Sequence, residues 1–91
     1  MQFKRLRKLI ESNNGVITNI GITRNEYNNK DYFSHIEFKF KGKIYKIYYN
    51  IDKIKNFEYS IAEGTQQNNI TIMASNKSYK EIKNMLLYIF N

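Results

Sequence analysis

The sequence predicts an α+β domain: a single-layer antiparallel sheet of about five strands, with N- and C-terminal helices packed on one face (αβββββα). Three observations lead to this prediction. Residues 32–50 alternate apolar and polar side chains around Gly42, as a half-buried hairpin does. Both ends of the chain carry apolar residues at helical spacing, and three further segments alternate with the period of a strand. A chain of 91 residues makes one domain, residues 1–91.

The hairpin runs from Tyr32 to Asn50 and is expected to turn at Lys41-Gly42, because glycine accepts the positive φ of a tight primed turn. Lysine is a poor partner in that turn, so a longer loop is the alternative. The face expected to be apolar carries Ile36, Phe38, Tyr45 and Ile47. The opposite face carries His35, Glu37, Lys39, Ile44, Lys46 and Tyr48. A slip of one residue would exchange the two faces.

A helix is predicted at each end of the chain. The first covers Gln2 to Ser12 and ends at Asn13-Asn14-Gly15, residue types that tolerate the left-handed conformation. The second covers Ser78 to Phe90 and begins with capping-box spacing between Ser78 and Glu81. Its apolar stripe comprises Ile82, Met85, Leu86 and Ile89, widened by Leu87, Tyr88 and Phe90. Both helices are expected on the apolar hairpin face, with Ile36, Phe38, Ile47, Leu86 and Ile89 buried together.

Three more strands complete the predicted sheet. In the first, Val16 to Arg24, we expect Val16, Ile20 and Ile22 on one face, and Gly21 marks a bulge or a close approach. The other two are Phe57 to Ala62 and Ile70 to Ser75. The segment Ile51 to Asn56 fits either a strand continuation or one helical turn.

The chain is strongly basic, with 15 lysines and arginines against 8 acidic residues and a formal net charge of +7. This excess favours a polyanionic partner: nucleic acid, an acidic protein or an anionic surface. The alternative is a coding bias, since Asn, Ile, Lys and Tyr abound as in AT-rich genomes. No apolar run reaches the roughly 18 residues of a membrane span, and the N-terminus lacks the apolar core of a secretory signal. We therefore expect a cytoplasmic protein without a membrane partner.

The sequence offers no set of residues typical of catalysis or cofactor binding. Without cysteine there is neither a disulfide nor a thiolate metal site, and aspartate occurs only at Asp31 and Asp52. His35 is the sole histidine, and no serine lies in a nucleophile elbow. The four glycines are isolated, so no phosphate-cradling loop is present. We expect a protein that is not an enzyme and has no metal, cofactor or small-molecule substrate.

Ser34-His35 on an early strand, in an α-β-β-β-α order, is similar to the HicA-type mRNA-interferase toxins over about the first fifty residues. That resemblance implies a histidine acting as general acid or base on RNA, a role that falls to His35. The alternative is an exposed strand histidine paired with Tyr48.

The segment Ser78 to Asn84, SYKEIKN, resembles the start of the last helix in double-stranded RNA-binding domains. The resemblance implies that Lys80 and Lys83, together with Lys77, hold RNA phosphates. A second basic group lies on the first helix, at Lys4, Arg5, Arg7 and Lys8. The alternative for both groups is an ordinary solvated helix surface.

In its general character, although not in any motif, this domain of under a hundred residues without a recognisable set of catalytic residues resembles the small phage-encoded anti-defence proteins. The anti-CRISPR proteins are the best-known group of these. The resemblance implies a non-catalytic protein of phage or mobile-element origin that inhibits a host nucleic-acid-handling complex by docking on its protein or nucleoprotein surface. The expected docking residues are Lys39, Lys46, Tyr48, His35 and Ile44. A DNA- or RNA-binding module of double-stranded-RNA-binding type is the first alternative, and a small RNase toxin using His35 is the second.

Overall fold

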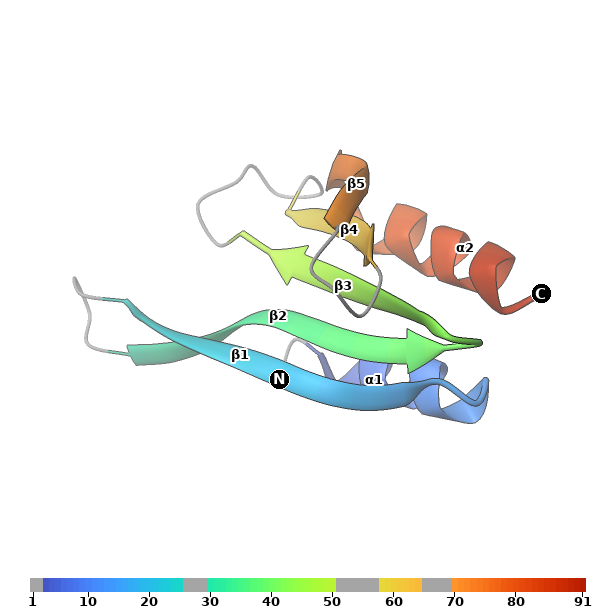
Figure 1. Cartoon of the computed structure of the whole chain (residues 1–91). Coiled ribbons are helices and arrows are strands. Elements are labelled where there is room, and N and C mark those ends of the chain that lie inside the picture. Colours follow the sequence, from blue (N-terminus) through green and yellow to red (C-terminus); the bar gives the residue numbers. More distant parts are fainter. Residues whose placement is uncertain (1–2, 26–29, 51–57, 65–69) are drawn as a thin grey trace.

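Five antiparallel strands lie between two helices along the chain, in the order that the sequence predicts (Figure 1). The computed structural model describes residues 3–25, 30–50, 58–64 and 70–91. The elements are α1 (Lys4–Ser12), β1 (Val16–Asn25), β2 (Lys30–Phe40), β3 (Lys43–Tyr49), β4 (Tyr59–Gly64), β5 (Ile70–Lys77) and α2 (Tyr79–Phe90). The strands form one sheet in the order β1-β2-β3-β4-β5, a simple meander. The predicted α+β class and the αβββββα order are confirmed.

The β2–β3 hairpin forms in the predicted register. Lys41 and Gly42 have φ angles of 50° and 80°, so both lie in the left-handed region that a two-residue primed turn requires. Phe38 pairs with Tyr45, and the pairs beside it follow in the same register up to His35 and Tyr48. The tight turn is therefore the correct alternative, and the longer loop is not needed.

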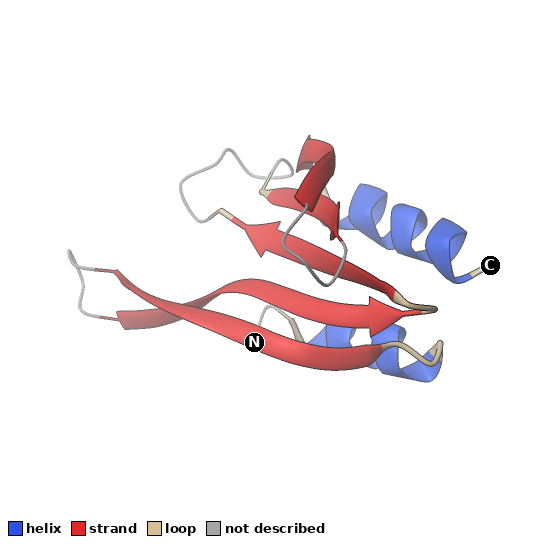
Figure 2. Ribbon diagram, in the orientation of Figure 1, coloured by secondary structure: helices blue, strands red, loops and turns tan. Residues whose placement is uncertain are grey.

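The core lies between the apolar face of the hairpin and both helices. Its buried members are Phe3, Leu6, Ile10, Ile36, Phe38, Phe40, Tyr45, Ile47, Tyr59, Ile61, Ile82 and Leu86. In Figure 2, α1 runs along β1 and β2 while α2 lies next to β4. Since both helices contribute to one core, they cover the same face of the sheet, as predicted.

Two details of the predicted core differ from the structure. Ile89 is only half-buried and packs at the margin of the core, where Ile36, Phe38, Ile47 and Leu86 are fully buried. Tyr88 does not widen the apolar stripe of α2, because it is 85% exposed.

Both helices end with the local devices that the sequence indicates. At the C-terminus of α1, Asn14 has a φ of 68°, and the amide of Gly15 donates to the carbonyl of Ile10 at 2.9 Å. With the bond from the Asn14 amide to the Glu11 carbonyl, this is a Schellman motif. At the start of α2, the side chains of Ser78 and Glu81 each accept from the other residue's backbone amide at 3.2 Å. The predicted capping box is confirmed.

The face predicted for β1 is wrong at Val16, because the strand carries a bulge. Ile17 lies opposite Phe38 and Ile20 opposite Ile36, so these two residues share the core face although they are three positions apart. The extra residue between them is Thr18, and it reverses the alternation. Val16 pairs with Lys39, on the other face, and is 62% exposed.

A second irregularity changes the pattern of β5. Ala74 lies opposite Ile61 on the core side, but Ile72 lies opposite Ala62, with Met73 as the extra residue between them. Ile72 is consequently 66% exposed instead of sharing a face with Ala74. The predicted alternatives for Ile51 to Asn56 lie outside the described residues.

Phe38→Ala is expected to lower the free energy of unfolding by about 3–5 kcal/mol, because the ring is fully buried and stacks on Tyr45 with centroids 5.2 Å apart. Urea-induced unfolding followed by circular dichroism measures the change. Tyr88→Ala is the matched control, since it removes an aromatic ring that is 85% exposed and should change stability by less than about 0.5 kcal/mol. Equal effects of the two substitutions would show that the core has been placed on the wrong face.

Candidate functional site

The sheet face opposite the helices is the principal candidate site, and we call it the open face. The β2–β3 pairing places on it the residues that the sequence assigned there: His35, Glu37, Lys39, Ile44, Lys46 and Tyr48. Tyr48 is 36% exposed, and the other five are half-buried. The face is therefore correctly predicted, and binding at its residues stays a prediction.

Neighbouring strands extend the open face with residues that the sequence did not point to. Val16 continues the row of Lys39 and Ile44, because it pairs with Lys39. Lys46 pairs with Ala62 on β4, and Ala62 pairs with Ile72 on β5, so Ile72 lies in the same cross-strand row as Glu37 and Lys46. Both are exposed apolar side chains brought to this face by the two bulges. A strict period of two places them on the core side, so the sequence offered no signal for them.

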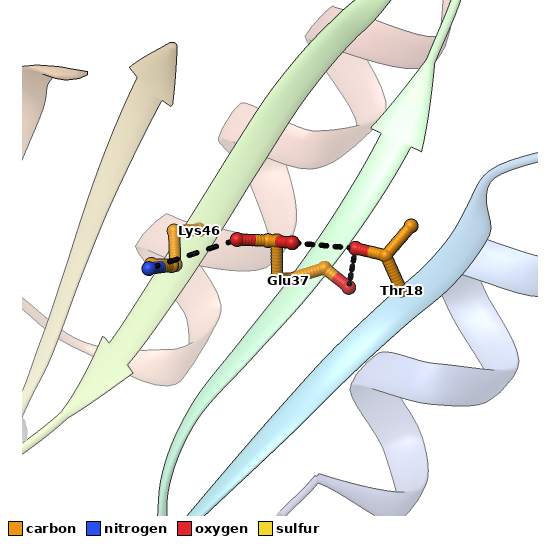
Figure 3. Close-up of polar contacts among 3 residues, drawn as sticks. All are labelled: Thr18, Glu37 and Lys46. Atoms are coloured by element: carbon orange, nitrogen blue, oxygen red, sulfur yellow. Dashed lines mark hydrogen bonds and ion pairs between the residues drawn. The ribbon is translucent and has the colours of Figure 1, made fainter. Parts of the chain in front are cut away.

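An ion pair lies at the centre of the open face. The Lys46 ammonium is 3.6 Å from a carboxylate oxygen of Glu37, and both side chains are half-buried. The Thr18 hydroxyl donates to the other carboxylate oxygen at 2.8 Å (Figure 3). Glu37 therefore links three strands, and its charge is held by a cation on one side and a hydroxyl on the other.

The imidazole of His35 lies across Gly21 on the neighbouring strand. A methyl group at this position would collide with the Cε1 and Nδ1 atoms of the His35 ring. The backbone of Gly21 lies outside the left-handed region, so the ring and not the φ angle requires glycine here. The predicted bulge or close approach at Gly21 is confirmed in both forms, since the pairing also shifts between Gly21 and Ile22.

The environment of His35 favours a neutral ring. Nε2 is buried without a hydrogen-bond partner, and the Tyr48 ring lies 6.1 Å away, centroid to centroid. Burial lowers the pKa of His35 below its usual value, and the positive charge of Lys46 lowers it further, against a smaller opposing effect of Glu37. The predicted pairing of His35 with Tyr48 is therefore present, but the side chain is half-buried and not exposed as the sequence analysis expected.

The basic residues of the two helices, together with Lys77 at the end of β5, divide into paired and unpaired groups. Arg7 forms an ion pair with Glu11 at 3.7 Å, and Lys77 forms one with Glu81 at the same distance. The unpaired cations are Lys4, Arg5 and Lys8 on α1 and Lys80 and Lys83 on α2. The structure brings Arg5 and Lys8 together with Lys83 around one hollow between the helices, a juxtaposition that the sequence could not provide.

Comparisons of the chain with protein-family models, curated proteins and solved structures found no match. Within residues 3–25, 30–50, 58–64 and 70–91, no three His, Asp or Glu side chains are grouped so that they could hold a metal ion. None of the helices in this described part of the chain has the length and hydropathy needed to cross a bilayer.

Gly21→Ala is expected to lower the free energy of unfolding by about 1–3 kcal/mol, because the new methyl group displaces the His35 ring. The same substitution in a His35→Ala background should be neutral or slightly stabilising, since the ring is gone and alanine is less flexible than glycine. A double-mutant cycle by urea unfolding measures this coupling. An equal cost in both backgrounds would contradict the packing of His35 on Gly21.

The pKa of His35 predicts a pH dependence of stability. Its pKa is lowered in the folded state, so the unfolded chain takes up a proton first as the pH falls through about 6.5. Stability relative to a His35→Gln variant should therefore be largest near pH 8 and should decrease toward pH 5. Urea midpoints of both proteins over this range provide the measurement. The variant is the control for the carboxylates, which titrate in both proteins; a constant difference would rule out the lowered pKa.

Proposed function

We propose that the protein is a non-catalytic binding protein whose open face docks on the protein surface of a nucleic-acid-handling complex. The observation that carries the proposal is the make-up of this face, which neither of the two described helices covers. Apolar side chains flank the central ion pair, with the exposed Val16 and the half-buried Ile44 on one side and the exposed Tyr48 on the other. Interfaces combine such apolar anchors with polar groups that already have partners.

The charges of the open face favour a protein over a nucleic acid as its partner. Lys46 is already paired with Glu37, so a phosphate would have to compete with a carboxylate that also repels it. Among the side chains of this face that the structure describes, that leaves Lys39 as the cation without an ion pair. A protein surface can accept the closed pair as it is and bury the apolar groups beside it.

His35 favours a binding role over catalysis. A general acid or base must bring a ring nitrogen within hydrogen-bond reach of its substrate. Nε2 of His35 is buried, and the ring is held between Gly21 and Tyr48. The lone histidine therefore fits a structural role on this face better than the chemistry of a toxin nuclease.

The class of partner follows from the resemblance in kind to small anti-defence proteins. The proposed partner is a host defence nuclease or its guide complex, and the protein would act in the host cytoplasm as an anti-CRISPR-type inhibitor. The basic charge supports this choice, since a nucleoprotein complex can offer acidic protein surface and bound nucleic acid together.

Tyr48→Ala is expected to weaken both partner capture and inhibition at least tenfold, because it removes the aromatic anchor of the open face. Capture from host lysate with and without RNase identifies the partner, and plasmid clearance by the CRISPR nuclease reports inhibition. Lys39→Glu, at a cation of this face that has no ion pair among the described residues, should mainly slow association, while most of the affinity persists over a salt series. Tyr88→Ala, with an exposed ring on α2, is the matched control.

Two results would contradict the proposal. If none of the open-face substitutions weakens capture, this face is not the docking surface. If His35→Ala abolishes the biological effect while binding and the melting curve stay unchanged, the protein is an enzyme and the toxin hypothesis replaces this one.

A further inference from the structure

The helix side of the molecule concentrates cations that have no acidic partner. Four basic residues occur within five positions of α1, and Glu11 neutralises Arg7 alone. On α2, the carboxylate of Glu81 accepts the capping hydrogen bond from the Ser78 amide and forms an ion pair with Lys77. Lys80 and Lys83 therefore have no ion pair with it. The excess positive charge of the described helices is therefore not balanced within them.

These cations meet in a groove between α1 and α2. The groove has a volume of about 290 Å³ and is lined by Arg5, Lys8, Leu9, Ser12, Tyr79 and Lys83. Three of these described lining residues are cations and none is acidic. Lys8 and Ser12 also border a second hollow along α1, whose other lining residues are Lys4 and the ion-paired Arg7 and Glu11. On α2, Lys80 lies one turn before Lys83, so it adds a further cation beside the groove.

The arrangement on α1 is electrostatically unfavourable in the free protein. Lys4 and Arg5 lie in the first turn, near the positive end of the helix dipole, and that turn has no acidic residue and no side-chain cap. Arg5 and Lys8 are three positions apart, and Lys4 and Lys8 four, so like charges are neighbours on the helix surface. A bound anion relieves both effects, whereas a merely solvated surface gains nothing from this pattern.

We propose that the interhelical groove binds the phosphate backbone of nucleic acid. A strip of cations from two helices matches a repeating row of phosphates, which presents one charge per roughly 3.4 Å along each strand. An acidic protein segment fits less well, because the described lining residues include no exposed aromatic anchor. Tyr79 is half-buried, with its ring centroid 6.0 Å from that of Tyr59. Contacts to phosphates carry no base readout, so binding is independent of sequence.

This site stands apart from the proposed docking surface. The groove lies between the helices, and the open face lies on the other side of the sheet. Nucleic-acid binding is tested with the purified protein and an oligonucleotide, without any partner protein. Failure of one proposal therefore leaves the other intact.

The test compares two triple variants that each remove three positive charges. The groove variant is Arg5→Gln/Lys8→Gln/Lys83→Gln, and the control is Lys39→Gln/Lys41→Gln/Lys43→Gln, three cations of the β2–β3 hairpin that lie outside the groove. Fluorescence anisotropy with labelled DNA and RNA duplexes is measured between about 50 and 200 mM salt. The groove variant should bind at least tenfold more weakly, with a salt slope smaller by about two to three, while the control changes less than about threefold.

Stability provides a second measurement. The groove variant should keep or raise the melting temperature, because it removes like-charge neighbours from the surface of α1. Adding duplex should raise the melting temperature of the natural protein and not that of the groove variant. Equal losses in both triple variants would reduce the effect to net charge and overturn the proposal. Displacement of the duplex by polyglutamate at equal charge concentration would overturn it in favour of an acidic protein.

Discussion

The register of the β2–β3 hairpin is the constraint on which the rest of the molecule depends. Side chains alternate along a strand, so one pairing decides the composition of both faces at once. The turn fixes that pairing by holding Lys41 and Gly42 at positive φ, which costs about 1 kcal/mol at the lysine. The stacked pair of Phe38 and Tyr45 and the Lys41 ammonium above the Phe40 ring offset this strain. The helices then have one apolar face to cover, and the Glu37–Lys46 pair is left on the other.

The fold was predictable wherever its causes are local. The hairpin, both helix ends and the capping box each follow from residues close in sequence, and all are present in the structure. The bulges at Thr18 and Met73 are different, because neither position carries a residue that marks a bulge. Each inserts one residue into the alternation, and this moved Val16 and Ile72 to the open face. Gly21 is the informative exception, since a lone glycine in a strand did indicate its close neighbour.

The candidate sites likewise comprise features that follow from local sequence and features that depend on tertiary packing. The ion pair between Glu37 and Lys46 followed from the hairpin register alone. The hydrogen bond from Thr18 to Glu37 depends on the bulge in β1, and the groove depends on how far apart the two helices pack. An apolar stripe gives the buried side of a helix but not its distance from a second helix on the same sheet. The sequence could therefore name the cations of α1 and α2 without predicting that they meet.

The two sides of the sheet differ in how their charges are arranged, so the net charge of +7 is not spread evenly over the molecule. On the open face, Glu37 neutralises Lys46 across two neighbouring strands, so the docking proposed there would depend on short-range contact of apolar groups. On the helix side, five cations have no acidic partner within the described helices, and their field extends about a Debye length, roughly 10 Å, into solvent. A long-range field acts during approach and a fitted face acts at contact, so the two proposed surfaces do not compete for one partner. For a nucleoprotein target, attraction at the helix side would raise the rate of encounter, and the open face would determine which protein is held.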